Sequence, residues 1–205
     1  MKKYLSFNYI LSTIILLMAI LQAPLFYYFL GGLVGLLIAP IYLLIGVILT
    51  IFLYLKVVLS KKPIKPFFIV AIICAPIIGS GSLFIDKAIE KADWALRRPA
   101  RNAIVEMVKE GKFNPNYPYN NVSCHVSDWS VLPISTSGND ISIERGRDKA
   151  VTVQFYINRG FLDHYSAFVY TNDSLRIKEI EYLASRAHGK GQTYKLDENW
   201  YRVSY

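Results

Sequence analysis

The first 85 residues contain no Asp, Glu, His or Arg, and this absence constrains the fold more than any other feature of the chain. Three apolar runs lie in this region, at about 4–23, 30–55 and 67–85. Each run is close to the roughly 20 apolar residues needed to cross the hydrocarbon core of a bilayer. The sequence therefore predicts three transmembrane helices.

The first run follows Met1–Lys3, as the apolar segment of a secretory signal peptide would. The run is long for that purpose, and its best small-residue site, Leu21–Ala23, is followed by Pro24. Proline is a poor residue just after a cleavage point, so we expect an anchor that is not removed.

The predicted spans carry no Asp, Glu, His, Lys or Arg, which disfavours a proton-coupled transporter or channel because ion pathways normally need such groups. Gly31, Gly35 and Ala39 are spaced four residues apart and lie on one face of the second span. This stripe could form a homo-oligomer contact, but packing among the protein's own helices is the favoured interpretation.

Lysine counts predict the orientation, because short cytoplasmic loops are enriched in Lys and Arg. The amino terminus and the 56–65 loop hold all six lysines of the first 85 residues, and the 24–29 connection holds none. We therefore expect the amino terminus in the cytoplasm and residues 86–205 outside it. This second part has a net charge of only +2 out of the chain's +8, which disfavours a nucleic-acid binder.

Residues 86–205 are predicted to form a small α+β domain with an antiparallel sheet. Helical spacing continues over Asp86–Arg98, a new helix is expected to begin at Pro99, and Gly111 is a plausible C-cap. Further along, short alternating runs predict strands, and 176–187 is either a short helix or an irregular excursion. The expected strands lie around 122–126, 141–143, 150–157, 165–171 and 200–205.

Two sets of charged residues are candidate sites. Arg97, Arg98 and Arg101 follow the third run and are candidate contacts for lipid headgroups, with a solvated helix face as an equal alternative. The second set is the segment Arg159-Gly160-x-x-Asp163-His164, which is either a polar bend between two strands or a functional group. The sequence favours the bend, because Gly160 and Asp163 are ordinary turn residues.

Catalytic and metal chemistry have weak support. Ser166 lies near His164, but no nucleophile elbow surrounds it. His125, Asp128, His164 and His188 are scattered without metal-ligand spacing, so neither a metal nor a cofactor is predicted. The two cysteines, Cys74 and Cys124, are expected to be small buried apolar residues.

The pattern Phe155-x3-Arg159-Gly160-x2-Asp163-x4-Phe168-x-Tyr170, together with a terminal Asn199-Trp200-Tyr201-x-Val203, resembles a segment of uncharacterised small bacterial multi-pass membrane proteins. The resemblance covers about a third of the chain and implies no activity. It implies a bacterial origin, and hence the cytoplasmic (inner) membrane.

The leading hypothesis is a non-enzymatic membrane-anchored protein that presents a small extracytoplasmic domain to a protein partner, in an immunity, envelope-assembly or sensory accessory role. The alternative is a membrane-tethered hydrolase using Arg159, Asp163 and His164. A flat patch formed by the aromatic residues Trp129, Tyr165, Trp200 and Tyr201 would favour binding, although such residues more often pack in a core.

Overall fold

The computed structural model describes residues 2–30, 32–59, 65–78, 83–127, 133–136, 139–159, 165–186 and 192–205. The chain divides into two compact units. The helical unit comprises Met1–Phe26 and Val34–Ile89, and the sheet unit comprises Tyr27–Leu33 and Glu90–Tyr205. The sheet unit therefore includes the connection between the first two helices.

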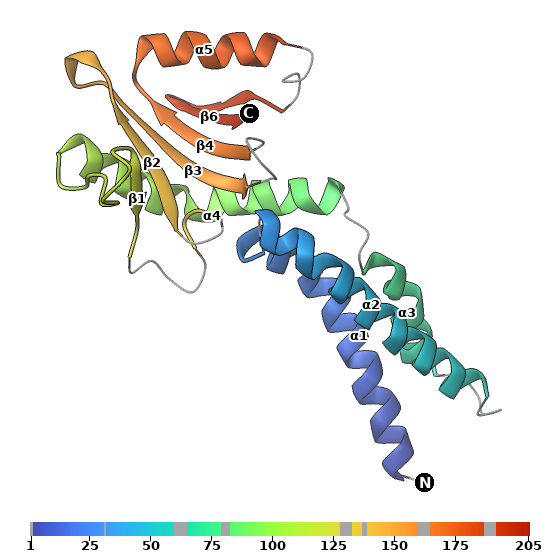
Figure 1. The fold of residues 1–205 in the computed structure, drawn as a ribbon. Helices are drawn as coiled ribbons and strands as arrows, with labels where there is room; N and C mark the ends of the chain where they lie inside the picture. The colour runs from blue at the N-terminus through green and yellow to red at the C-terminus, as the bar shows by residue number, and fades with distance from the viewer. Residues whose placement is uncertain are drawn as a thin grey trace. The chain divides into compact units, whose positions relative to one another are not determined.

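The helical unit is built from α1 (Lys2–Tyr28), α2 (Gly32–Val58), α3 (Pro66–Cys74) and the 3-10 turn η1 (Ala75–Ile77) (Figure 1). Among the described residues, two segments are long and apolar enough to cross a membrane, Phe7–Tyr28 and Leu33–Val57. Their outward side chains are mostly aliphatic and exposed, which suits contact with lipid better than contact with water.

The third predicted span is not one continuous helix. Its described part forms α3, η1 and the start of α4 (Leu83–Lys109), while 79–82 lie outside the described residues. The apolar helical stretch here, Pro66–Ile77, is shorter than a bilayer-spanning helix.

One prediction about α4 was wrong. The helix does not restart at Pro99 but runs through it without interruption. Proline removes one backbone hydrogen bond and disfavours helical geometry before it, so the continuity must come from packing along the whole helix. Gly111, with φ of 74°, follows the end of α4 and its N–H donates to the carbonyl of Val108, as the predicted C-cap requires.

The sheet unit contains, in the part of the chain that is described, a six-stranded sheet in which neighbouring strands are antiparallel. The spatial order is β1-β2-β3-β4-β6-β5. The predicted α+β domain with an antiparallel sheet is confirmed. The strands are β1 (Ser123–His125), β2 (Asp140–Arg145), β3 (Val151–Arg159), β4 (Tyr165–Thr171), β5 (Tyr194–Asp197) and β6 (Trp200–Ser204).

Helices cover both faces of the sheet (Figure 1). On one face, Ile104, Val105 and Val108 of α4 pack against alternate residues of the strands. On the other face, α5 (Ser174–Ser185) packs Ile180 against β4 and β6. The alternation of side chains along each strand sends one set of residues into each layer.

Candidate functional site

The Arg159–His164 bend connects β3 to β4. Arg159 is the last residue of β3 and pairs with Tyr165, the first residue of β4. The predicted hairpin between these strands is therefore confirmed, but Gly160, Asp163 and His164 lie outside the described residues, as does the side chain of Arg159. Whether this group has a function stays a prediction.

The arginines that follow the third run are not equivalent. Arg101 is 1% exposed and Arg97 is 8% exposed, so both side chains lie inside the sheet unit. Arg97 donates to the backbone carbonyl of Pro133, and burial lowers the pKa of its guanidinium, with nearby Arg101 acting in the same direction and Asp93 against it. Arg98 is about half exposed and pairs with Asp197. In this arrangement only Arg98 keeps the access that a lipid headgroup contact requires.

Arg101 forms a buried ion pair with Asp93, one of the few charged residues that the structure hides from water. The Arg101 Nη2 atom lies 2.5 Å from Asp93 Oδ2, and Asp93 is 1% exposed. Arg101 Nη2 also donates to the carbonyl of Ile134 at 3.2 Å. Burial of a charge is costly unless the group is both paired and hydrogen-bonded, and these contacts meet both conditions.

The rings of Phe168 and Phe155 enclose the Arg101 guanidinium. The Arg101 Cζ atom lies 4.7 Å from the centre of the Phe168 ring and 5.9 Å from that of Phe155. A cation over an aromatic face is attracted to it, and the attraction grows when water is excluded. Arg101 and the two rings thus join α4 to β3 and β4 in the interior of the domain.

Asp93 also accepts hydrogen bonds from the end of α1. The Tyr28 hydroxyl donates to Asp93 Oδ1 at 3.0 Å, and the Tyr27 hydroxyl donates to Oδ2 at 3.3 Å. These two tyrosines are the last residues of α1 and belong to the same compact unit as Asp93. We refer to Tyr27, Tyr28, Asp93, Arg97 and Arg101 as the Asp93 cluster.

Sequence reasoning missed the Asp93 cluster, although part of its signal was present. Asp93, Arg97 and Arg101 recur every four residues and so share one face of a helix. Arg97 and Arg101 were predicted, with Arg98, to lie on a solvated or lipid-facing surface, whereas they lie on the inward face. Tyr27 and Tyr28 are 66 and 65 residues away from Asp93, and sequence spacing gives no signal over that separation.

A second charged contact joins the end of the sheet to α4. The Arg202 Nε and Nη2 atoms contact the two carboxylate oxygens of Glu90 at 3.0 and 3.3 Å, in a two-pronged arrangement. Planar paired contacts of this kind fix geometry as well as charge. The contacts of Glu90 and those of the Asp93 cluster together hold residues 90–101 of α4 against the sheet.

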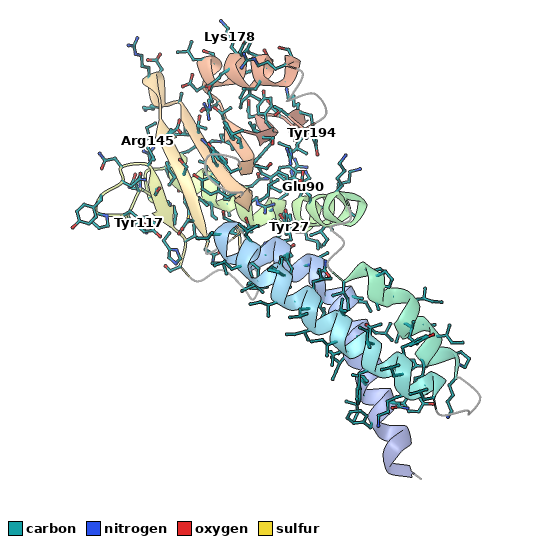
Figure 2. The ribbon with its side chains drawn as sticks, turned by 45° about the vertical axis from the view of Figure 1, so that its right-hand side comes forward. Tyr27, Glu90, Tyr117, Arg145, Lys178 and Tyr194 are labelled. Atoms are coloured by element: carbon teal, nitrogen blue, oxygen red, sulfur yellow. The ribbon has the colours of Figure 1, made fainter. Side chains whose placement is uncertain are left out.

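The turn at Tyr117–Val122, which we call the tyrosine turn, is ordered and displays aromatic side chains at the surface. Asn120 Oδ1 accepts from the backbone N–H groups of Val122 and Ser123 at 2.9 and 3.0 Å. Tyr117 is labelled in Figure 2, and its hydroxyl donates to Asp140 Oδ1 at 2.9 Å. Tyr119 is 100% exposed.

The neighbouring edge of the sheet is covered by a side chain. Asn116 donates to the carbonyl of His125 at 2.9 Å and accepts from its N–H at 2.8 Å, along the outer edge of β1. A partner strand could not use these backbone groups. His125 itself contacts Asp140 at 2.9 Å, while Asp128, His164 and His188 lie outside the described residues. No group suited to holding a metal ion occurs among the residues that were described.

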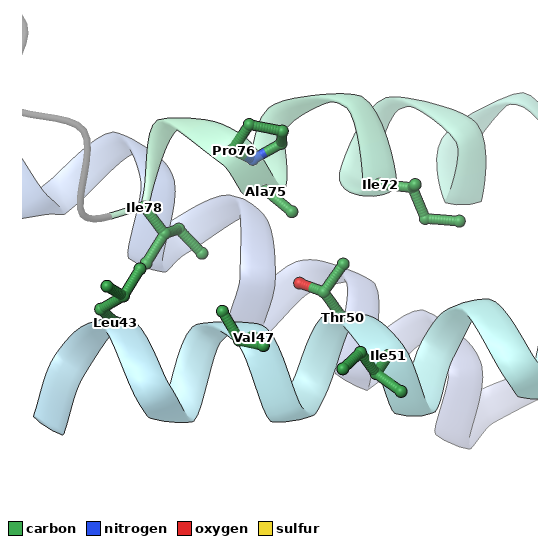
Figure 3. Close-up of a pocket in the computed structure, with 8 residues that line it drawn as sticks. All are labelled: Leu43, Val47, Thr50, Ile51, Ile72, Ala75, Pro76 and Ile78. Carbon is green, nitrogen blue, oxygen red and sulfur yellow. The ribbon is translucent and has the colours of Figure 1, made fainter. Parts of the chain in front are cut away.

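A pocket of about 340 Å³ lies within the helical unit, between α2 and the segment formed by α3 and η1 (Figure 3). Its polar lining residue, Thr50, donates to the carbonyl of Gly46 on its own helix at 2.7 Å and so offers little to a polar ligand. The lining residues are Leu43, Val47, Thr50, Ile51, Ile72, Ala75, Pro76 and Ile78.

Other predicted residues have structural partners. Trp200 and Tyr201 are buried on opposite faces of β6, Tyr165 stacks on Tyr205, and Trp129 lies outside the described part of the chain, so no flat aromatic patch is seen among the rest. Ser166 Oγ donates to Ser204 Oγ at 3.3 Å.

The small-residue stripe of α2 is only partly described. Gly35 is buried and Ala39 half-buried in the helical unit, whereas Gly31 lies outside the described residues. The burial of Gly35 fits packing among the protein's own helices, and the homo-oligomer contact stays a prediction.

Comparison of the chain with known protein families, curated proteins and solved structures finds no match. The resemblance to small bacterial membrane proteins therefore stays a prediction. The chemistry of the described sites is that of a structural ion pair and an exposed aromatic turn.

Proposed function

We propose that the protein is a non-enzymatic, membrane-anchored module that holds a small α+β domain at the outer surface of a bacterial cytoplasmic membrane and presents it to a protein partner. The observation that carries the proposal is the contact of Tyr27 and Tyr28 with Asp93. This contact ties the domain to the connection between two apolar helices, so the domain is held at the membrane and does not hang from a free linker.

The same contact supports three membrane crossings. If α1 and α2 both span, Phe29 lies on the side opposite the amino terminus, and Lys65 lies on the amino-terminal side. Because Tyr28 binds Asp93, the sheet unit shares the side of Phe29. The chain must therefore cross once more between Lys65 and Asp93, which supports a third, interrupted span over 67–85.

The lysine distribution supports the outward orientation. Lysines flank the side of the amino terminus and the 56–65 loop, and the connection that binds the domain has none. The partner would then be met outside the cytoplasm, in an immunity, envelope-assembly or sensory accessory role.

The tyrosine turn is the surface that we propose for the partner. It presents Tyr119 on a loop that hydrogen bonds hold in place, so binding would order few groups. Asn116 covers the adjacent edge of β1, so recognition there would use side chains and not strand addition.

Topology is tested with fusions to the full chain. A reporter that is active only outside the cytoplasm should be active after Tyr205 and inactive near Lys61, and amino-terminal sequencing should begin at or next to Met1. Cytoplasmic location of the carboxyl-terminal fusion would overturn the proposal, and a start near Pro24 would require two spans instead of three.

Presentation is tested by a photo-crosslinking amino acid at Tyr119 in living cells. Tyr182 is the matched control, because it is also an exposed tyrosine, at 59%, but lies on α5. We expect an adduct of one defined mass from position 119 and none from position 182. Equal crosslinking at both positions, or at neither, would contradict the tyrosine turn as the contact surface.

A further inference from the structure

The first half of α4 in the sheet unit has its polarity reversed. Asp93, Arg97 and Arg101 point inward and are buried, whereas a stripe of exposed apolar residues runs along the outer side from residue 92 to 103, flanked by the exposed Arg98 and Asn102. A helix on the surface of a soluble domain normally buries its apolar stripe. The residues of this stripe, which we call the α4 ridge, are Ala92, Ala95, Leu96, Pro99 and Ala103.

The second half of the same helix has the ordinary pattern. Ile104, Val105 and Val108 are buried. Glu106, in the last turn of α4, and Glu110, just after its end, are exposed. The exposed side of this one helix thus changes from mainly apolar to charged near Ala103. Leu96, at 77% exposed, is the largest apolar side chain of the ridge. Such exposure is unfavourable in water but not in the apolar part of a membrane surface.

The connectivity of the chain indicates that the membrane surface is the medium that suits the α4 ridge. Tyr28 ends one apolar segment of membrane-spanning length and Leu33 begins the next, so the turn between them lies at the bilayer surface. The Tyr28 hydroxyl is 3.0 Å from Asp93, which places the first half of α4 at the same depth. Phe29 and Leu33, both more than half exposed, belong to the same compact unit. Lys91 is exposed beside the ridge and can meet lipid phosphates.

We propose that the α4 ridge lies in the membrane surface, with Leu96 and its neighbouring alanines in the glycerol and upper acyl region of the phospholipids. The inference rests on the proposed anchoring of the domain by Tyr27 and Tyr28, but it does not depend on which side of the membrane the domain occupies. The domain thereby has a second, shallow membrane contact besides its spans.

The test measures quenching of a fluorophore by brominated phospholipids in nanodiscs that hold the full chain. A bimane group is attached to Leu96→Cys or Leu175→Cys, each in a Cys74→Ala background. Leu175 is the matched control because it is a leucine with 72% exposure, placed in the first turn of α5. We expect loss of most of the fluorescence at position 96 and little change at position 175. Ala92→Cys should be quenched like position 96.

Weak quenching at positions 92 and 96, equal to that at 175, would overturn the proposal. Disulfide crosslinking between two copies through position 96 would also overturn it, because a second chain would then cover the ridge. Thermal melts of the labelled variants serve as the control that they are folded. A topology fusion that reports a cytoplasmic domain, together with quenching at position 96, would contradict the proposed function but leave this inference intact.

Discussion

The two faces of the sheet differ in what they bury. The face under α4 holds a group of large rings, in which the centre of the Trp94 ring lies 5.1 Å from the ring centres of both Phe168 and Trp200. The Arg101–Asp93 ion pair lies next to these rings. The face under α5 holds mainly aliphatic side chains around Ile180, together with the buried ring of Tyr201. This face also carries buried hydroxyl groups, such as those of Thr152 and Thr171, which are 2.8 Å apart.

From this difference we expect the α4 face to contribute more to the stability of the domain than the α5 face. Large rings bury more apolar area than Ala167, Val169 and Val203 on the α5 face, and burial is the main favourable term in folding. The buried charges lie on the same side as the rings. The face that contacts Tyr27 and Tyr28 is therefore also the face on which we expect substitutions to be most damaging.

Removing Asp93 should break the comparison most strongly. Asp93→Ala leaves the Arg101 guanidinium buried without its partner, and we expect a loss of about 3–5 kcal/mol in the free energy of unfolding. Arg101→Met combined with Asp93→Ala should recover much of the loss, because an apolar pair no longer strands a charge. Denaturant unfolding of the full chain in detergent, followed by tryptophan fluorescence, measures both. A single variant as stable as the parent would show that the pair carries little weight.

A matching change on the α5 face should cost less. Ile180→Ala deletes a side chain that is 1% exposed, and we expect a loss of about 2 kcal/mol, at the lower end for such deletions, because one helix over small residues can settle into the space. The same unfolding measurement applies. A loss equal to that of Asp93→Ala would make the two faces equivalent and remove the basis of the comparison.

The beginning of α5 offers a smaller effect on the same face. Asp173 Oδ1 accepts from the N–H of Leu175 at 2.9 Å and caps the helix. Asp173→Ala should lower the free energy of unfolding by about 1 kcal/mol, whereas Asp173→Asn, which keeps a capping oxygen, should change it little. If alanine and asparagine behave alike, the capping contact is not what holds the helix.

Cys124 sharpens the comparison through reactivity. It lies in the α4-side core, where burial, and secondarily the charge of Asp140, raises the pKa of its thiol to about 11. A Cys74→Ala variant should therefore resist alkylation by iodoacetamide at pH 8 when folded and react when denatured, as mass spectrometry would show. Because the folded pKa is raised, the contribution of this thiol to stability is present below pH 9 and declines as the pH rises towards 11. Rapid alkylation of the folded protein at pH 8 would contradict this burial.

Much of the fold follows from local patterns. Val151, Val153, Phe155 and Ile157 alternate with their neighbours in sequence, and they form the side of β3 that packs against α4. β5 was missed because Tyr194–Asp197 is short and half charged, so its strand form comes from pairing with β6 and not from its own residues. The unbroken helix at Pro99 was missed for a related reason, since contacts on both sides of the proline override its local preference.

The candidate site was less predictable than the fold. The inward face of α4 has a periodic signal, but the sign of its burial is the reverse of the usual one, so an amphipathic interpretation points the arginines outward. The partners that make burial tolerable, Tyr27 and Tyr28, come from another element. A single chain read in order gives no measure of such distant contacts.

The position of Asp93 also sets an order of assembly. Its carboxylate receives Arg101 from within α4, but in the proposed topology its two hydroxyl donors reach it only if the far end of α1 lies on the same side of the bilayer as the domain. A domain separated from correctly inserted helices would retain a buried carboxylate short of two of its donors. If the proposed topology holds, stable folding of the domain would depend on correct insertion of α1, and a wrongly inserted chain would carry a weakness that quality-control proteases can detect.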